Sequence, residues 1–390
     1  MKVAVAGAIA DIAADEWDTC ARDAAARSAG EDPDNPFLRH AFLLALEESG
    51  SVRADTGWQP VHVTVRDESG ALLAVAPCYL KGHSRGEYVF DHAWADAFER
   101  AGGRYYPKLL VAVPFTPATG PRLLVRAGPR AEEAATALIG GLRKLRDAAH
   151  ASSIHVNFTT HHDASRLEAE DFLPRVDCQY HWSNEGFAVF DDFLGTLASR
   201  KRKAIKRERR DALGNGISVE LLTGAAITPS HWDAFYGFYQ DTAARKWGGG
   251  YLTRAFYDAI GRTLSNRILL VMARRGGRYI AGAINFIGGD TLFGRHWGAV
   301  EEHPFLHFEL CYYQAIDFAI AHGLKRVEAG AQGEHKLARG YRPVLTRSHH
   351  DIVNPDFRRA VAAYLAQERP AVEREVASMQ DETPFRHEQA

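Results

Sequence analysis

The residues best suited to chemistry are concentrated between positions 294 and 341. Polar groups cost free energy to bury unless each finds a partner, so a segment that only filled a core would carry few of them. This density of bases, acids and hydrogen-bonding side chains therefore predicts a functional site. The residues concerned are His296, His307, Glu309, Tyr312, Tyr313, Gln314, Glu328, Gln332, Glu334, His335, Lys336, Arg339 and Tyr341.

Two further groups of charged residues lie outside this segment. Residues 199–210 hold eight basic side chains, which is consistent with a solvated helix face or with the recognition of phosphate groups. In the first half, Glu87 and Asp91 fall on one face of a predicted strand, with His83 before them and Lys108 after them. These carboxylates are suited either to holding an amine or to forming salt bridges at the end of a sheet.

The elements that must position these residues occur in the same order in both halves of the chain. Each half contains a hairpin, a further strand, a helix and a closing strand, and such an internal duplication predicts two similar lobes. We therefore expect an α/β (α+β) fold of two tandem lobes, 1–190 and 191–370, with a tail at 371–390. Each lobe is expected to be a mixed, mostly antiparallel sheet flanked by helices. The predicted strands lie within 61–76, 87–91 and 153–158 and within 267–284, 291–297 and 325–328, and the predicted helices are 131–149 and 305–321.

Several motifs along the chain are long enough to be specific. They are His83–Asp91, Tyr105–Lys108, Val113–Pro117, Ser199–Lys203, Gly294–Gly298, His307–Gln314 and Glu328–Tyr341. Through them the chain resembles the FemAB-like branch of the GNAT acyltransferase superfamily, a group associated with peptidoglycan biosynthesis or recognition. Some proteins of similar sequence act as bacterial ceramide synthases. The resemblance implies two tandem GNAT lobes and an N-acyltransferase that joins an acyl group to a primary amine.

The resemblance also implies roles for the residues described above. Acyl transfer to an amine needs a base for the amine proton, N–H donors for the oxyanion and a proton for the departing thiolate. Glu309 is suited to be that base, or to be a first-turn acid favoured by the helix dipole, and both alternatives stay open. We expect as catalytic residues His307, Glu309, His335 and Tyr341; as substrate-binding residues His83, Glu87, Asp91, Tyr106, Lys108, His296, Lys336 and Arg339; and as ligands of the donor phosphates Arg200, Lys201, Arg202, Lys203 and Arg207.

The donor site departs from the usual pattern of GNAT proteins. Those proteins hold the pyrophosphate of coenzyme A on a glycine-rich turn before a helix. This chain has Gly298-Ala-Val-Glu-Glu-His-Pro304 at that place, and Glu301 and Glu302 repel phosphate. We therefore expect an acyl-CoA or acyl carrier protein donor held through other side chains, or else an aminoacyl-tRNA. No tightly bound cofactor and no metal ion are expected.

Three functions are compatible with the resemblance. The one we favour is transfer of a long acyl chain from a thioester to a lipid amine, as in ceramide synthesis and sphingolipid metabolism. The segment Tyr105–Pro117 fits it as an apolar slot or a membrane-contacting loop, although an ordinary buried strand has the same composition. The second function is transfer of an amino acid from aminoacyl-tRNA to a peptidoglycan precursor, but the chain shows no pair of long charged helices for tRNA. The third is a non-catalytic module that binds peptidoglycan.

Composition restricts the surroundings of the protein. The 390 residues carry a net charge of −2, so no global field favours nucleic acid or a membrane. The cysteines Cys20, Cys78, Cys178 and Cys311 form no C-x-x-C pair, which fits a reducing cytoplasm. The apolar run at the N-terminus is too short to span a bilayer and predicts a first strand. We expect a cytoplasmic location, with peripheral contact at the inner face of the membrane as an alternative.

Overall fold

The computed structural model describes residues 1–330 and 333–386, and the chain forms two compact units. The first unit consists of Met1–Asp177 and Leu345–Glu373, and the second begins at Cys178, runs to Val344 and resumes at Arg374. The units are thus divided at other places than the predicted lobes 1–190 and 191–370. Residues 345–373 belong to the first unit because β15 (Arg342–Ile352) pairs antiparallel with β8 (Ser153–Asn157) from Ser348 onward.

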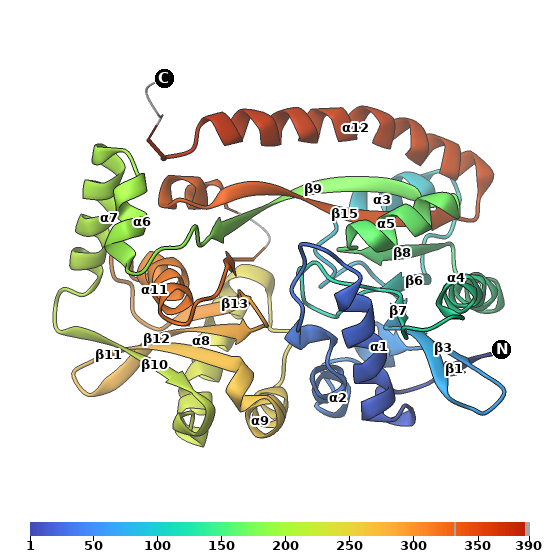
Figure 1. Cartoon of the computed structure of the whole chain (residues 1–390), viewed down its shortest axis with the longest axis horizontal. Helices are drawn as coiled ribbons and strands as arrows, with labels where there is room; N and C mark the ends of the chain where they lie inside the picture. The colour runs from blue at the N-terminus through green and yellow to red at the C-terminus, as the bar shows by residue number, and fades with distance from the viewer. Residues whose placement is uncertain (331–332, 387–390) are drawn as a thin grey trace. The chain divides into compact units, whose positions relative to one another are not determined.

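The first unit contains strands of two sheets (Figure 1). In one sheet the strand order is β1-β3-β4-β7, and in the other it is β2-β5-β6-β8-β15. The hairpin predicted over 61–76 is present as β3 and β4. β6 and β8 pair in parallel, so the chain crosses over between them through α4. The bounds are β1 (Lys2–Ala6), β2 (Trp58–Pro60), β3 (His62–Arg66), β4 (Leu72–Ala76), β5 (Cys78–Lys81), β6 (Lys108–Val111), β7 (Leu124–Val125), α1 (Ala14–Ala26), α2 (His40–Glu48), α3 (His92–Arg100), α4 (Ala131–Ala148) and α5 (His161–Ala169).

The core of the first unit forms where α4 packs on these strands. Leu138, Ile139 and Leu142 recur at the spacing of one helix face, and all three are buried against Val63 and Val111. Burial of one apolar helix face is what fixes a helix on a sheet, because each buried aliphatic side chain contributes about 1.5–3 kcal/mol.

The second unit is built on strands in the order β10-β11-β12-β13-β14-β9. Neighbours from β10 to β13 pair antiparallel, whereas β13 and β14 pair in parallel. The hairpin predicted over 267–284 is present as β11 and β12. The bounds are β9 (Leu173–Ser183), β10 (Ile217–Thr223), β11 (Ile268–Arg275), β12 (Arg278–Ile287), β13 (Thr291–Ala299), β14 (Arg326–Glu328), α6 (Phe190–Thr196), α7 (Ser199–Ala212), α8 (Pro229–Trp247), α9 (Arg254–Thr263), α10 (Leu306–Phe308) and α11 (Gln314–Ala321).

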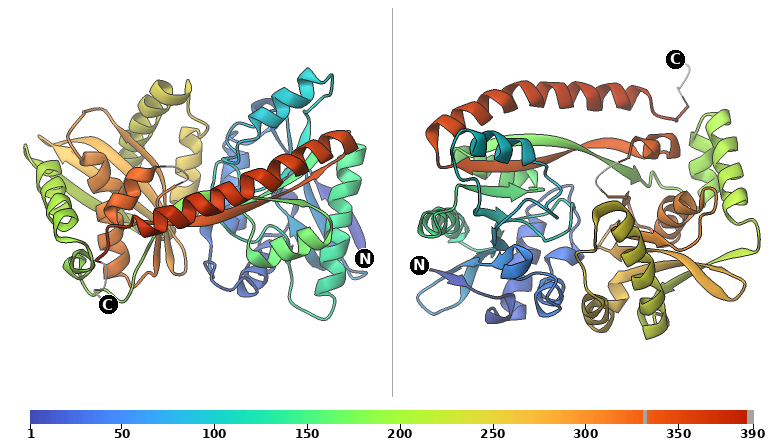
Figure 2. Two further views of the ribbon diagram at one scale, coloured as in Figure 1. Left: turned by 90° about the horizontal axis from the view of Figure 1, so that it is seen from above. Right: turned by 180° about the vertical axis from the view of Figure 1, so that it is seen from behind.

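Helices α8 and α11 cover opposite faces of this sheet. Side chains alternate along a strand, and on β12 Gly282 faces Phe235 of α8, whereas Ala281 and Ala283 pack in the core that contains the α11 residues. Figure 1 shows α11 in front of the sheet, and the right-hand view of Figure 2, seen from behind, brings the olive α8 and α9 to the front.

Most predicted elements are present, but the strand predicted at 87–91 is not. This segment belongs to the loop between β5 and α3, in which Tyr88 has a φ of 59°. A left-handed residue interrupts the extended backbone that a strand requires. The inference that Glu87 and Asp91 share a strand face is therefore wrong in its premise, although the two carboxylates do come together, as described below.

For two other segments the structure decides between the alternatives that the sequence left open. Most of Tyr105–Pro117 is core, with Tyr105 only 1% and Phe115 only 3% exposed, so this segment is not a membrane-contacting loop. The residues after 370, for which a tail or frayed helix was predicted, continue the helix α12 (Pro355–Asp381). In both places tertiary packing decides the outcome, because composition alone does not distinguish a buried strand from an apolar loop.

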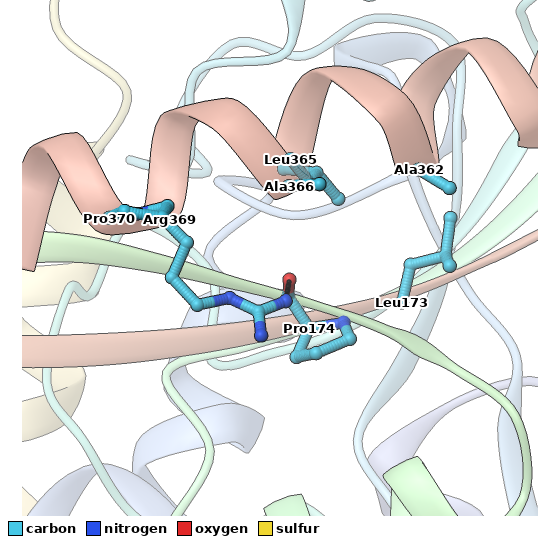
Figure 3. A pocket seen from close by; sticks show the side chains of 7 residues that line it. All are labelled: Leu173, Pro174, Ala362, Leu365, Ala366, Arg369 and Pro370. Atoms are coloured by element: carbon cyan, nitrogen blue, oxygen red, sulfur yellow. Dashed lines mark hydrogen bonds between the residues drawn. The ribbon is translucent and has the colours of Figure 1, made fainter.

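A pocket of about 300 Å³ lies in the first unit beside α12 (Figure 3). Arg369 crosses it and donates a hydrogen bond of 2.8 Å to the carbonyl oxygen of Pro174. The lining is otherwise mostly apolar and consists of Leu173, Pro174, Ala362, Leu365, Ala366, Arg369 and Pro370. The pocket contains none of the predicted site residues.

Candidate active site

The sheet of the second unit opens between β13 and β14. The two strands pair for three residues, and the pairing ends at Phe293 and Glu328. Beyond this point β13 continues to Ala299 along β12, so that, within the described part of the chain, this stretch of β13 has no strand on its second side. A bulge opposite Asn285 adds local twist where the strands separate. A ligand with backbone-like amides can pair with such an edge as an additional strand.

A cleft of about 570 Å³ adjoins the unpaired part of β13. Trp297 of β13 and His307 of α10 lie edge to face on its wall, with ring centroids 5.2 Å apart. The cleft combines this aromatic wall with apolar and charged side chains, and its lining is Thr242, Arg245, Trp297, Ala299, Glu301, Glu302, His303, Pro304, Leu306 and His307. A site of this kind holds a largely apolar ligand with a few polar groups.

The polar side of the cleft carries the two glutamates that replace the glycine-rich turn. Glu301 is compensated, since Arg275 lies 2.7 Å and His303 2.9 Å from its carboxylate. Glu302 is 96% exposed and lies 3.9 Å from Arg245, which is too far for a hydrogen bond. This side of the cleft therefore offers little attraction to a pyrophosphate group.

The helix after the cleft contains a π-helical turn, η6 (Glu309–Tyr313), between α10 and α11. Such single turns are frequent at functional sites. Glu309 is fully buried, and both of its oxygens are occupied by Arg209 of α7, at 3.1 and 3.0 Å, while Gln314 adds a third bond of 2.7 Å. This geometry is that of a structural ion pair, a role that neither of the two interpretations of Glu309 had named.

Tyr312 and His335 form a hydrogen-bonded pair next to this turn. The Tyr312 hydroxyl lies 2.8 Å from Nε2 of His335, which belongs to η7 (Glu334–Arg339). Burial raises the pKa of Tyr312, so its hydroxyl keeps its proton. Partial burial, together with Arg339 and Lys336, lowers the pKa of His335, so the imidazole is neutral near pH 7. The ring of His307 is 5.4 Å from Tyr312, which connects the pair to the cleft.

Three other predicted residues surround this pair. Lys336 is 1% exposed, donates a 3.0 Å hydrogen bond to the carbonyl oxygen of Gly330, and has its pKa lowered by burial to about 8. Arg339 donates to Glu208 of α7 at 3.0 Å. Tyr341 is fully buried with its ring 5.5 Å from Tyr312, and within the described residues its hydroxyl has no hydrogen-bond partner. Gln332 lies outside the described residues.

His296 and the basic helix contribute differently. His296 packs edge to face on Tyr239 at 5.1 Å, and burial lowers its pKa to about 3, so this ring is a neutral packing element. On α7, Arg209 forms an ion pair with Glu309, and Lys206 lies 2.9 Å from Asp191. Within the described residues, no hydrogen bond or ion pair is formed by the side chains of the five predicted phosphate ligands Arg200, Lys201, Arg202, Lys203 and Arg207.

The first unit holds a separate cluster of buried charges around Lys108. This lysine donates at 2.8 Å to Ser84 and to Glu87, and it also binds Asp91. Burial opposes the ionisation of Asp91, but Lys108 outweighs it and holds the pKa of this carboxyl well below its usual range. Burial raises the pKa of Glu87 to about 7. Tyr105 donates to Asp91 at 2.6 Å, whereas, within the described residues, Oε1 of Glu87 and Oδ1 of Asp91 accept no hydrogen bond.

The remaining candidates of the first unit border this cluster. Tyr106 lies 2.8 Å from Ser84, hydroxyl to hydroxyl. His83 lies outside the charge cluster, and its ring nitrogens are engaged by the backbone of Thr56 and Arg85. The predicted substrate-binding residues thus fall into two groups, one in each unit.

Several residues of these clusters have roles that the sequence did not reveal. Tyr312 was counted in the polar segment without a role of its own, and its contact with His335 supplies one. Arg209 was counted among the basic residues without its buried partner. Lys81 is fully buried beside Glu87, with its ammonium 3.4 Å from the centre of the Trp58 ring. The sequence did indicate that Lys81 is buried. It lies two residues after Tyr79 in an apolar strand, so the two side chains face the same side of the sheet.

The fold and the site together define a class of protein: two units of mixed α/β structure, one of which has parallel strands that diverge beside a cleft. Comparison with family models gives the family. The FemAB-like family, described as peptidoglycan biosynthesis/recognition, matches residues 8–387, and the chain belongs to this family. The fold class and the resemblance inferred from the sequence are therefore confirmed. No protein of curated function matches the sequence.

Solved structures with the same fold include FemX and a tandem GNAT protein. FemX is 13% identical, with 93% of this chain and 100% of FemX covered at a TM-score of 0.55. A tandem GNAT protein of the clavulanic acid biosynthesis pathway is 12% identical, with 91% and 99% covered at a TM-score of 0.50. The C-terminal domain of a putative lysylphosphatidylglycerol synthetase from Agrobacterium fabrum is 10% identical, with 92% and 97% covered at a TM-score of 0.50. These likenesses establish two GNAT-like lobes.

Within the described ranges, no helix is long and apolar enough to cross a membrane.

Proposed function

We propose that the protein is an N-acyltransferase that moves an acyl group from a thioester donor, such as acyl-CoA, to a primary amine. The observation that carries this proposal is the opening between β13 and β14 with a cleft and a Tyr312–His335 pair beside it. The edge of β13 can pair with the amides of a pantetheine arm, and the cleft can take the adjoining part of the donor. The arrangement supplies a place for the thioester next to groups that move protons.

The chemistry follows from the Tyr312–His335 pair. The amine gives its proton to the imidazole of His335 and attacks the thioester carbonyl, which forms the new C–N bond and an oxyanion. When the oxyanion collapses, the C–S bond breaks and the thiolate takes the proton of the Tyr312 hydroxyl. Tyr312 regains a proton from Nε2 of His335, so the tyrosine is restored and the imidazole is again neutral. The proton taken from the amine is then on Nδ1, and exchange with solvent restores the starting tautomer. The buried cation Lys336 supplies positive charge near the oxyanion.

A long acyl chain and a lipid amine are the substrates we propose. Glu301 and Glu302 stand where the donor phosphates would otherwise be held, so donor affinity must come largely from apolar contacts. Each buried CH₂ contributes about 0.8 kcal/mol. An acceptor with a long apolar chain, such as the long-chain amino alcohol of ceramide synthesis, agrees with a donor of that kind. The buried segment Tyr105–Pro117 no longer supports this choice.

The test is a chain-length series with purified protein. Acyl-CoA donors from acetyl to palmitoyl are incubated with a long-chain amino alcohol, and free thiol and amide product are measured together. We expect palmitoyl-CoA to exceed acetyl-CoA by at least tenfold in kcat/KM. Equal or better rates with acetyl-CoA would end the long-chain proposal.

Matched variants test the proposed roles of the side chains. His335→Ala and Tyr312→Phe should each lower kcat at least tenfold while the thermal midpoint changes little, because general acid–base groups typically contribute about 10²–10⁴-fold. His322→Ala and Tyr364→Phe are the controls, since both side chains are solvent-exposed and are not part of the cleft. Unchanged turnover in both site variants would place the reaction elsewhere.

A second candidate function is transfer of an amino acid from aminoacyl-tRNA to a peptidoglycan precursor. The description of the family and the whole-chain likeness to FemX favour it. The same donor assay distinguishes the two functions when charged tRNA replaces acyl-CoA. Activity only with charged tRNA would select this second candidate.

A further inference from the structure

The outer face of α7 presents a line of basic side chains. At about 100° per residue, Arg200, Lys203 and Arg207 fall within about 60° of one another and span about 10 Å of the helix. Ile205 is 2% exposed and marks the opposite, buried face. Figure 1 shows α7 beside α6 in the second unit. The three basic side chains therefore point away from the core.

These charges lack the partners that three other basic residues of α7 have. Lys206 pairs with Asp191, Arg209 with Glu309, and Arg210 with Asp211. Within the part of the chain that the structure describes, Arg200, Lys203 and Arg207, which we call the stripe, form no ion pair. The net charge of the whole protein is −2, so this is a local positive field on a nearly neutral molecule.

Exposed apolar side chains lie at the ends of the same two helices. Leu213 follows the last turn of α7 and is 38% exposed, and Val189 immediately precedes α6 and is 56% exposed. A nucleic acid gains little from such aliphatic groups, and α7 carries no aromatic residue on which a base could stack. A bilayer surface gains from both kinds of group, since anionic lipids attract the cations while aliphatic side chains enter the interface.

We propose that this face of α7 docks the protein on an anionic lipid surface, with Leu213 and Val189 adding aliphatic contacts from the ends of α7 and α6. The inner edge of the same helix is tied to the candidate site, because Glu208 accepts from Arg339 at 3.0 Å and Arg209 binds Glu309. Docking through α7 therefore holds the site at a fixed distance from the lipid. The proposal does not depend on the transfer reaction.

The test is vesicle binding without either substrate. Wild-type protein is sedimented with vesicles of phosphatidylcholine alone or with about 30 mol% phosphatidylglycerol, at low salt and at about 0.5 M NaCl. We expect binding only to the anionic vesicles, and its loss in high salt. The variant R200A/K203A/R207A should lower the partition coefficient about 100-fold, since each interfacial cation contributes about 1 kcal/mol.

A charge-matched control separates the stripe from net charge. The variant R100A/K144A/R262A removes the same three charges at exposed positions elsewhere and should bind within about twofold of wild type. L213S/V189S should weaken binding to anionic vesicles and leave the salt dependence intact.

Three results would overturn the proposal. They are no binding of wild type to anionic vesicles at low salt, equal binding by the stripe variant and its control, or tighter binding of a duplex RNA than of the vesicles. A higher KM for acyl-CoA in the stripe variant, with vesicle binding unchanged, would instead assign the stripe to the donor phosphates. Because no substrate is present in the binding assay, a failure of the docking proposal would leave the proposed transfer reaction untouched.

Discussion

Replacing Lys108 with methionine tests whether the charge cluster of the first unit holds its loop in place. Lys108 is fully buried, and its ammonium binds Ser84, Glu87 and Asp91, all from the loop between β5 and α3. Methionine keeps most of the side-chain volume and removes the charge. The perturbation is therefore electrostatic, because it leaves two buried carboxylates without their main partner.

The expected magnitude follows from the burial of these partners. Glu87 and Asp91 have side chains that are 1% exposed, and after the substitution the nearest cation to Glu87 is Lys81, at 3.8 Å. Removing one partner of a buried ion pair costs about 3–5 kcal/mol. At about 2–4 °C per kcal/mol for a unit of this size, the thermal midpoint should fall by about 6–20 °C.

The pH dependence of this loss is a second part of the prediction. Without Lys108 the buried carboxyls acquire a pKa above that of the unfolded chain, so the folded variant binds protons that the unfolded chain releases. The stability deficit should therefore be larger at pH 8 than at pH 5. Chemical denaturation at both pH values measures it, with Lys144→Met as the control, since Lys144 is an exposed lysine. A deficit below about 1 kcal/mol at pH 8 would refute the assignment of Lys108 as the central counter-ion.

Three further predictions follow from single contacts. Burial raises the pKa of Glu87 to about 7 from a usual 4.5. The contribution of this group to stability is therefore present at low pH and is lost as the pH rises from about 4.5 to 7. The free energy of unfolding of wild type, relative to that of Glu87→Gln, should fall over that window, and parallel pH profiles of the two proteins would contradict this prediction. Gly298→Ala places a Cβ 2.2 Å from the carbonyl oxygen of Phe238, so the variant should have a lower thermal midpoint than wild type. A midpoint equal to wild type would show that α8 shifts freely. Glu309→Gln removes the charge of a fully buried carboxylate that pairs with the half-buried Arg209, and it should cost about 2–4 kcal/mol in denaturant unfolding. A loss of turnover with full stability would restore Glu309 as a base.

The sequence determined the elements and their duplication because these depend on local patterns. The hairpins at 61–76 and 267–284 carry alternating apolar residues around a glycine turn, and such a pattern specifies a pair of strands whatever surrounds it. The helix after β13 could be predicted in the same way, because its apolar positions recur at helical spacing. The strand expected at 87–91 failed for the same local reason, since alternation alone does not reveal a left-handed residue such as Tyr88.

The division of the chain and the partners of its charges were decided only by tertiary structure. Residues 345–373 join the first unit through the pairing of β15 with β8, between segments nearly two hundred positions apart. The sequence placed Glu309 in a cluster of functional residues, but whether a carboxylate is a base or a counter-ion depends on what approaches its oxygens, and Arg209 comes from another helix. Hydrogen bonds and ion pairs act over a few ångströms in space, so spacing along the chain identifies the groups that can react and leaves their partners to the fold.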